Sequence, residues 1–99
     1  MTVEATTKNF DELITKGKVI VNFHAEWCGP CKMLAPIYEQ LPQEVKDVSF
    51  VKIDVDQQHE LAQRFNISSI PTLLVFENGV KLKEERGLLP KDKLLELIK

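Results

Sequence analysis

The 99-residue sequence contains only two cysteines, Cys28 and Cys31, and therefore lacks the disulfide framework of many small secreted domains. No stretch approaches the run of about 18 apolar residues that a membrane-spanning helix needs. The first eight residues have neither a basic start nor an apolar stretch, so they are unlike a secretory signal. These absences favour a cytoplasmic protein, although a chain from which a targeting segment had been removed would read the same way.

The sequence also lacks an excess of charge of either sign. Thirteen Lys and Arg residues stand against fifteen Asp and Glu residues, so the net charge is −2 with the histidines neutral. This balance provides no strong field for nucleic acid or for an anionic membrane, and neither is an expected partner. No repeat, linker or low-complexity tract interrupts the chain, and 43% of its residues are apolar. Length and composition therefore predict one domain over residues 1–99.

Apolar periodicity predicts alternating strands and helices. Thr7 is expected to cap the first helix, Pro36 to kink the longest helix without ending it, and Asn78-Gly79 to form a hairpin turn before an edge strand. The predicted strands are 3–6, 19–23, 48–55, 72–77 and 80–86. The predicted helices are one that begins at Asn9 and ends at Gly17, then 28–44, 60–65 and one opening at Pro90, with Leu94, Leu95 and Ile98 on one stripe. This order predicts an α/β fold, with a central mixed sheet of four to five strands flanked on both faces by four helices.

The two cysteines form the motif Cys28-Gly29-Pro30-Cys31, which follows the strand predicted at 19–23 and opens a predicted helix. At a helix start, unpaired backbone N–H groups and the helix dipole favour the thiolate form of Cys28 over its thiol. Cys31 lies three residues later on the same side of the first turn, where it can close a disulfide ring. The pair is therefore expected to cycle between dithiol and disulfide.

A zinc site and a pair of inert buried thiols are the alternative interpretations of this motif. Zinc would require a second pair of ligands, and the only histidines, His24 and His59, do not have zinc-finger spacing relative to the cysteines. We therefore expect no bound metal.

The segment 25–33, Ala-Glu-Trp-Cys-Gly-Pro-Cys-Lys-Met, resembles the active-site segment of the thioredoxin family, as does Pro36 five residues after the second cysteine. The resemblance continues at 51–56, at 70–73, in the Asn78-Gly79 turn and at Gly87, so it covers essentially the whole chain. It implies a thioredoxin fold and the reduction of protein disulfides without a bound cofactor. The implied partners are a thioredoxin reductase and disulfide-containing client proteins, and the protein is expected to be a monomer.

The resemblance also assigns roles to the cysteines. Cys28 would attack a client disulfide and form a mixed disulfide, which Cys31 would then resolve. Gly29-Pro30 is the dipeptide found between the cysteines of reducing members of the superfamily, so a reductase is favoured over an oxidase or isomerase.

The resemblance further implies a docking groove. In the family, the proline that corresponds to Pro71 is cis and faces the disulfide, which leaves the backbone of Ile70 free to pair with an extended client segment. Trp27 and Gly87 would complete the border of this shallow groove. In the alternative interpretation Trp27 serves packing, and a pure binding module would use the groove with its cysteines incidental.

Asn22 is the main departure from the family pattern, which usually has a buried aspartate here that takes the proton of the second cysteine. An amide cannot accept that proton. Lys52, which matches a family lysine, thereby loses its carboxylate neighbour and is expected to extend toward solvent or to meet Glu26 or Asp54.

His24 lies on the same face of its strand as Asn22. Because its ordinary pKa lies near neutrality, His24 could relay protons for Cys31. The alternative is a half-buried histidine at a strand end that has a structural hydrogen-bond partner.

Overall fold

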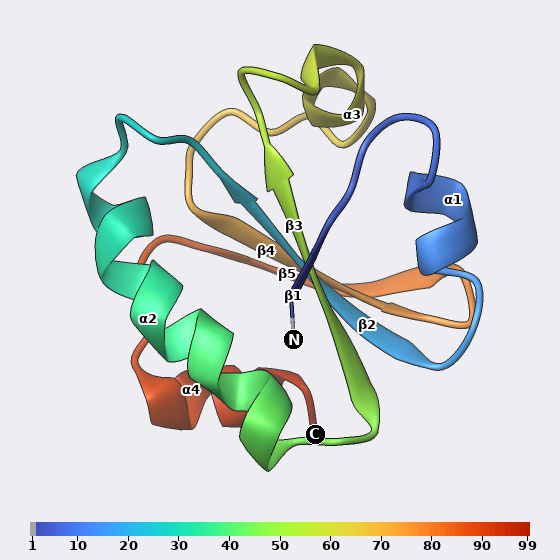
Figure 1. The fold of residues 1–99 in the computed structure, drawn as a ribbon, viewed down its shortest axis with the longest axis vertical. Coiled ribbons are helices and arrows are strands. Elements are labelled where there is room, and N and C mark those ends of the chain that lie inside the picture. The colour runs from blue at the N-terminus through green and yellow to red at the C-terminus, as the bar shows by residue number, and fades with distance from the viewer. Residues whose placement is uncertain (1) are drawn as a thin grey trace.

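The computed structural model describes residues 2–99 and confirms the predicted alternation of strands and helices (Figure 1). Along the chain, the elements are β1 (Thr2–Glu4), α1 (Phe10–Leu13), β2 (Lys18–His24), α2 (Gly29–Glu44), β3 (Val48–Asp54), α3 (His59–Arg64), β4 (Thr72–Glu77), β5 (Val80–Arg86) and α4 (Lys91–Leu97). Among the residues described, no helix is long and apolar enough to cross a membrane.

The strands form one mixed sheet in the order β1-β3-β2-β4-β5, as predicted, with β5 at an edge. β3 runs parallel to both β1 and β2, whereas β4 runs antiparallel to β2 and β5. The central strand β2 is therefore hydrogen-bonded along both sides, and its residue Asn22 lies between Lys52 of β3 and Leu73 of β4. The loop that leads from this strand to α2 ends at Cys28, and Cys31 lies in the first turn of that helix.

Helices cover both faces of the sheet (Figure 1). On one face, Phe10 of α1 and Leu61 of α3 pack with alternate residues of β2, namely Val19, Val21 and Phe23. On the other face, α2 and α4 pack over Ile20 of the same strand. Leu94 and Ile98 are buried there as predicted, Leu95 is partly buried, and Leu97 is a further core residue. Because side chains alternate along a strand, Asn22 and His24 belong to the face that α2 covers.

The first strand and first helix begin and end differently from their predicted limits. Parallel pairing ends at Glu4 and Lys52, and the chain then turns, so β1 does not reach Thr6. In this turn the Oδ1 of Asn9 accepts the N–H of Thr6 at 2.7 Å. Asn9, rather than Thr7, is the N-cap residue of the four-residue helix α1. The prediction of Thr7 as the cap is therefore wrong.

Prolines mark two further details of the helices. α2 continues through both Pro36 and Pro42, so Pro36 does not end the helix, as predicted. Pro90 is the N-cap of α4 rather than its first helical residue, because its backbone is extended, with φ −70° and ψ 163°.

Tyr38 links α2 to the sheet through its buried hydroxyl group. The hydroxyl oxygen lies 2.7 Å from the carbonyl oxygen of Val51 and 3.0 Å from that of Ile20, so one proton serves two acceptors on neighbouring strands. Burial raises the pKa of Tyr38 well above its usual range, because the charged phenolate would lose its hydration.

We therefore expect no ionisation of Tyr38 in the folded protein as the pH passes about 10, the ordinary pKa of tyrosine. The unfolded chain releases this proton more readily, so this group leaves stability unchanged below about pH 10 and lowers it above that pH. Tyr38 is the only tyrosine, so ultraviolet difference absorbance reports on it alone. Phenolate absorbance should appear only together with loss of the far-ultraviolet circular dichroism of the fold. A titration near pH 10 with the fold intact would contradict this expectation.

Candidate active site at the start of helix α2

Cys28 and Cys31 are joined as a disulfide at the start of α2, with their Cα atoms 5.2 Å apart. Cys28 is the N-cap residue, and its Sγ accepts the backbone N–H of Cys31 at 3.2 Å. Gly29 and Pro30, which lie between the two cysteines, are the first residues of the helix. Proline suits this position because the first N–H groups of a helix have no partner within it, so the N–H that proline lacks is not missed. The first turn carries no acidic side chain to oppose a negative charge on Sγ. The geometry thus favours a thiolate at Cys28 whenever the disulfide is reduced.

Both cysteines are nearly covered, since each is only 4% exposed. The covering residues include Ala25 and the partly buried Val55 and Ile70. Only a small part of Cys28 is therefore accessible to an approaching sulfur atom.

The segment around Pro71 lies against Cys28. The Ile70–Pro71 peptide bond is cis, as the resemblance implied. The carbonyl oxygen of Ile70 lies 3.8 Å from the Sγ of Cys28. Gly87 donates its N–H to the carbonyl oxygen of Pro71 at 2.8 Å, with a φ of +94° that favours glycine. The structure therefore brings together three segments that are far apart in the sequence.

Trp27 is a surface residue, because it is 68% exposed. Its indole Nε1 donates to the Oδ2 of Asp56 at 2.7 Å, which fixes the ring beside the cysteines. The alternative that Trp27 serves core packing is therefore wrong. The indole borders a shallow depression of about 170 Å³ together with Val55, Ile67, Ser68, Ser69 and Ile70.

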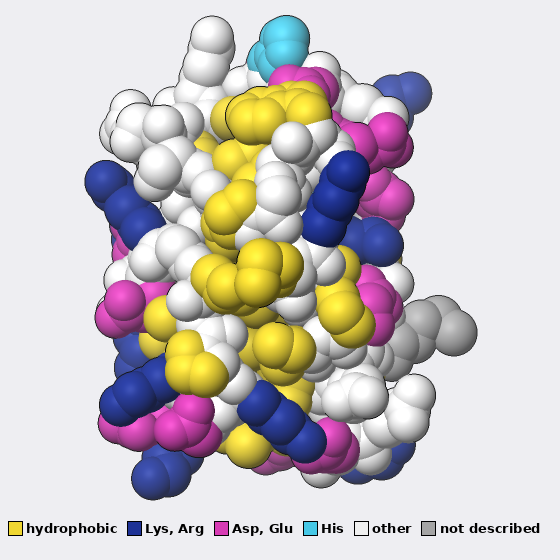
Figure 2. All heavy atoms as spheres, turned by 90° about the vertical axis from the view of Figure 1, so that its left-hand side faces the viewer, with side chains coloured by type: hydrophobic (Ala, Val, Ile, Leu, Met, Phe, Trp, Pro, Cys, Tyr) yellow, Lys and Arg dark blue, Asp and Glu magenta, His cyan; other side chains and the backbone are white. Residues whose placement is uncertain are grey.

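Exposed hydrophobic side chains surround this region. Figure 2 shows them as a band along the side of the molecule that carries α2. Trp27 in the loop before α2, Met33 in α2 and Leu88 after β5 are among the exposed large hydrophobic residues. Such a surface suits contact with the apolar parts of a polypeptide.

Lys52 forms an ion pair that was not predicted. Its Nζ lies 3.6 Å from the Oε2 of Glu39 on α2, and 33% of the lysine side chain is exposed. The prediction that Lys52 would extend toward solvent is consistent with this exposure, but Glu26 and Asp54 are the wrong partners. No sequence motif identifies Glu39 as the partner of Lys52, because this ion pair depends on how α2 lies across β3.

Asp54 caps the turn after β3 and forms no ion pair with Lys52. Its Oδ1 accepts the backbone N–H groups of Asp56, at 2.8 Å, and of Gln57, at 3.3 Å. Asn22 is 4% exposed, and its Oδ1 has no hydrogen-bond partner among the described residues. Within residues 2–99, no charged side chain donates a hydrogen bond to the Asn22 oxygen.

His24 ends β2 beside Cys31. Both residues line one hollow of about 380 Å³, together with Ala25, Glu26, Lys32 and Ala35. The Nε2 of His24 is buried and has no hydrogen-bond partner within residues 2–99. The structure thus gives this nitrogen no structural partner of the kind that the alternative interpretation requires.

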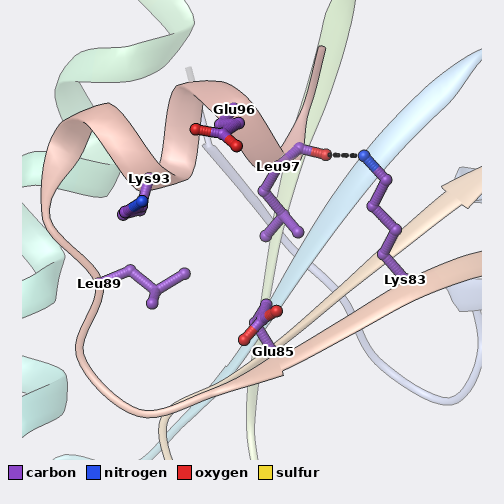
Figure 3. A pocket seen from close by; sticks show the side chains of 6 residues that line it. All are labelled: Lys83, Glu85, Leu89, Lys93, Glu96 and Leu97. Atoms are coloured by element: carbon purple, nitrogen blue, oxygen red, sulfur yellow. Dashed lines mark hydrogen bonds between the residues drawn. The ribbon is translucent and has the colours of Figure 1, made fainter.

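A separate hollow between β5 and α4 contains none of the predicted site residues (Figure 3). Lys83 crosses it and donates to the carbonyl oxygen of Leu97 at 3.1 Å, near the end of α4. The remaining lining residues are Glu85, Leu89, Lys93 and Glu96. Within residues 2–99, no three His, Cys, Asp or Glu side chains are arranged to bind a metal ion.

Comparison with known proteins gives consistent matches. The family model described as Thioredoxin matches residues 1–99. The chain is 48% identical over 90 residues to a thioredoxin of Mycoplasmoides gallisepticum, covering 90% of each protein. It is 45% identical over 97 residues to a thioredoxin of Bacillus subtilis, covering 97% of this chain and 93% of that protein.

Solved structures agree with the sequence matches. The structure of Plasmodium falciparum thioredoxin has a TM-score of 0.91 and 39% identity, and the match covers 97% of this chain and 95% of that one. A mutant thioredoxin from Halobacterium salinarum has a TM-score of 0.92 and 34% identity, with coverage of 98% and 87%. These matches confirm the predicted thioredoxin fold and the thiol-disulfide oxidoreductase activity. Likeness of both sequence and structure extends over nearly the whole chain, which therefore belongs to the thioredoxin family.

Proposed function

We propose that this protein reduces disulfides of client proteins in the cytoplasm, as a monomer that carries electrons from a thioredoxin reductase. It acts as one domain over residues 1–99 and needs no bound cofactor. The observation that carries this proposal is the position of Cys28, whose Sγ caps α2 and accepts the N–H of Cys31 at 3.2 Å. The family supplies the general kinds of partner, namely disulfide-containing proteins and a thioredoxin reductase.

The reaction consists of two exchanges of sulfur bonds. In the first, the thiolate of Cys28 attacks the client disulfide, and one client sulfur leaves with the electron pair of the broken bond. In the second, Cys31 attacks Cys28, which re-forms the disulfide described above and releases the other client sulfur. The reductase then returns the pair to the dithiol state.

The docking groove positions the client for the first exchange. The backbone of Ile70 lies beside Cys28 and can pair with an extended client segment, while Pro71 and Gly87 hold this part of the loop in place. Trp27 provides an apolar border that Asp56 keeps in one orientation. Backbone pairing supplies affinity without strong sequence preference, which suits a reductase with many clients.

We expect the reduced protein to reduce the disulfides of insulin, and to do so repeatedly when NADPH and a thioredoxin reductase are supplied. NADPH consumption measures the electron flow, and precipitation of the insulin B chain measures the product. Omission of the reductase is the control, and it should limit reduction to the amount of dithiol protein added. Reduction that did not depend on this protein, or a reduction potential well above the cytosolic poise, would contradict the proposed role.

A further inference from the structure

The resolving step poses a problem in this chain, because the Cys31 thiol must lose a proton while it is nearly covered. Cys31 is 4% exposed. Asn22 is a buried polar residue on the sheet face that α2 covers, but its side chain is an amide and cannot take a proton. Lys52 and Glu39 are paired with each other, and Asp54 accepts two backbone N–H groups. A base for Cys31 must therefore be sought elsewhere around it.

The hollow beside Cys31 contains three other ionisable side chains, namely Glu26, Lys32 and His24. The carboxylate of Glu26 is exposed to solvent, whereas Cys31 is nearly covered, so Glu26 is the poorer candidate. The ammonium of Lys32 has no lone pair to accept a proton and instead favours negative charge on sulfur. His24 remains, because a neutral imidazole has one ring nitrogen that can accept a proton.

We propose that His24 is the proton acceptor for Cys31 during resolution, a role that rests on the reductase function proposed above. His24 and Cys31 line the same hollow of about 380 Å³, which is large enough for a water molecule. The Nε2 of His24 is shielded from solvent and has no hydrogen-bond partner among residues 2–99, so no hydrogen bond through this nitrogen holds the ring in another role. His24 thereby takes over the task that a carboxylate at position 22 would perform.

The S–H bond of Cys31 breaks, and its proton passes through a bridging water to the neutral imidazole of His24. The Cys31 sulfur bonds to that of Cys28, and the bond between Cys28 and the client sulfur breaks, so that the client sulfur leaves as a thiolate. The cysteine pair is oxidised by two electrons and the client disulfide is reduced by two. The imidazolium then returns the proton to the departing thiolate or to solvent.

Stopped-flow kinetics can test this role with a peptide disulfide whose two halves carry different fluorophores. Release of the first half reports attack by Cys28, and release of the second half reports resolution by Cys31. In His24→Gln, resolution should be at least about tenfold slower than in the wild-type protein at pH 7.

Two further variants make the test specific. His59→Gln changes the only other histidine, which is exposed on α3, and should leave both phases and their pH profiles unchanged. In His24→Ala, imidazole added to the buffer should restore resolution at pH 7, which a purely structural role of His24 would not allow. The attack phase should remain the same in all these proteins.

The proposal would be overturned by a resolution rate of His24→Gln at pH 7 that equals the wild-type rate. A failure of imidazole to rescue His24→Ala would also overturn it. A missing attack phase in the wild-type protein would instead refute the reductase function itself.

Discussion

Cys28→Ser is expected to abolish disulfide reduction, lowering its rate by at least about a thousandfold, because the attacking sulfur is lost. A serine hydroxyl at the same N-cap position still accepts the N–H of residue 31, so the helix start and the fold should be kept. The insulin assay measures the loss, and circular dichroism checks the fold. Residual reduction within tenfold of the wild-type rate would show that Cys28 is not the nucleophile.

Cys31→Ser should separate the two exchanges, because attack by Cys28 remains possible while resolution does not. A mixed disulfide between Cys28 and the client peptide should accumulate in one equivalent, and intact-protein mass spectrometry detects it. The double variant with serine at both positions should form no such adduct. If that double variant retained the whole cellular activity of the protein, a binding module that uses the groove would replace the reductase as the explanation.

Phe10→Ala is expected to destabilise the fold strongly, with a loss of about 3–5 kcal/mol in the free energy of unfolding. Phe10 is fully buried, and its ring makes edge-on contacts with Phe65 and Phe76 at centroid distances of 5.4 and 5.9 Å. The guanidinium of Arg64 lies 5.4 Å from the centre of the same ring. Because α1 has only four residues, it depends on this packing rather than on its own helical hydrogen bonds.

Urea unfolding measures this loss, and Leu82→Ala is the matched control. Leu82 is an apolar residue of the edge strand β5 that is 52% exposed, so its truncation should change stability by at most about 0.5 kcal/mol. Equal effects of the two substitutions would show that the cluster around Phe10 does not hold α1 in place. Since Phe10 lies on the face of the sheet opposite α2, the folded Phe10→Ala protein should retain its redox activity.

Most of the fold could be predicted because its elements carry strong local patterns. The buried strands β2 and β3 are apolar runs, and α2 has helical spacing of its apolar residues. The ends of short elements were harder to predict, since they depend on tertiary contacts. β1 stops where its pairing with β3 stops, and the cap of α1 is Asn9 rather than Thr7 because of the turn that follows β1.

The candidate site could be predicted where a residue's position follows from a motif. The Cys-x-x-Cys spacing fixes the helix start and the disulfide, and the resemblance to thioredoxins indicated the neighbourhood of Ile70 and Pro71. The partners of Lys52 and Trp27 could not be predicted in this way. Glu39 and Asp56 lie on other elements, and nothing in their local sequence shows that they face these residues.

The loop between β2 and α2 joins the central strand of the sheet to a helix whose first turn is capped by Cys28. Electron transfer can therefore proceed with little rearrangement of the surrounding scaffold, because only the sulfur atoms need to separate or meet. Oxidised and reduced forms would then present almost the same outline to other proteins. A reductase and a client must in that case tell the two forms apart by the chemistry of the sulfurs rather than by shape.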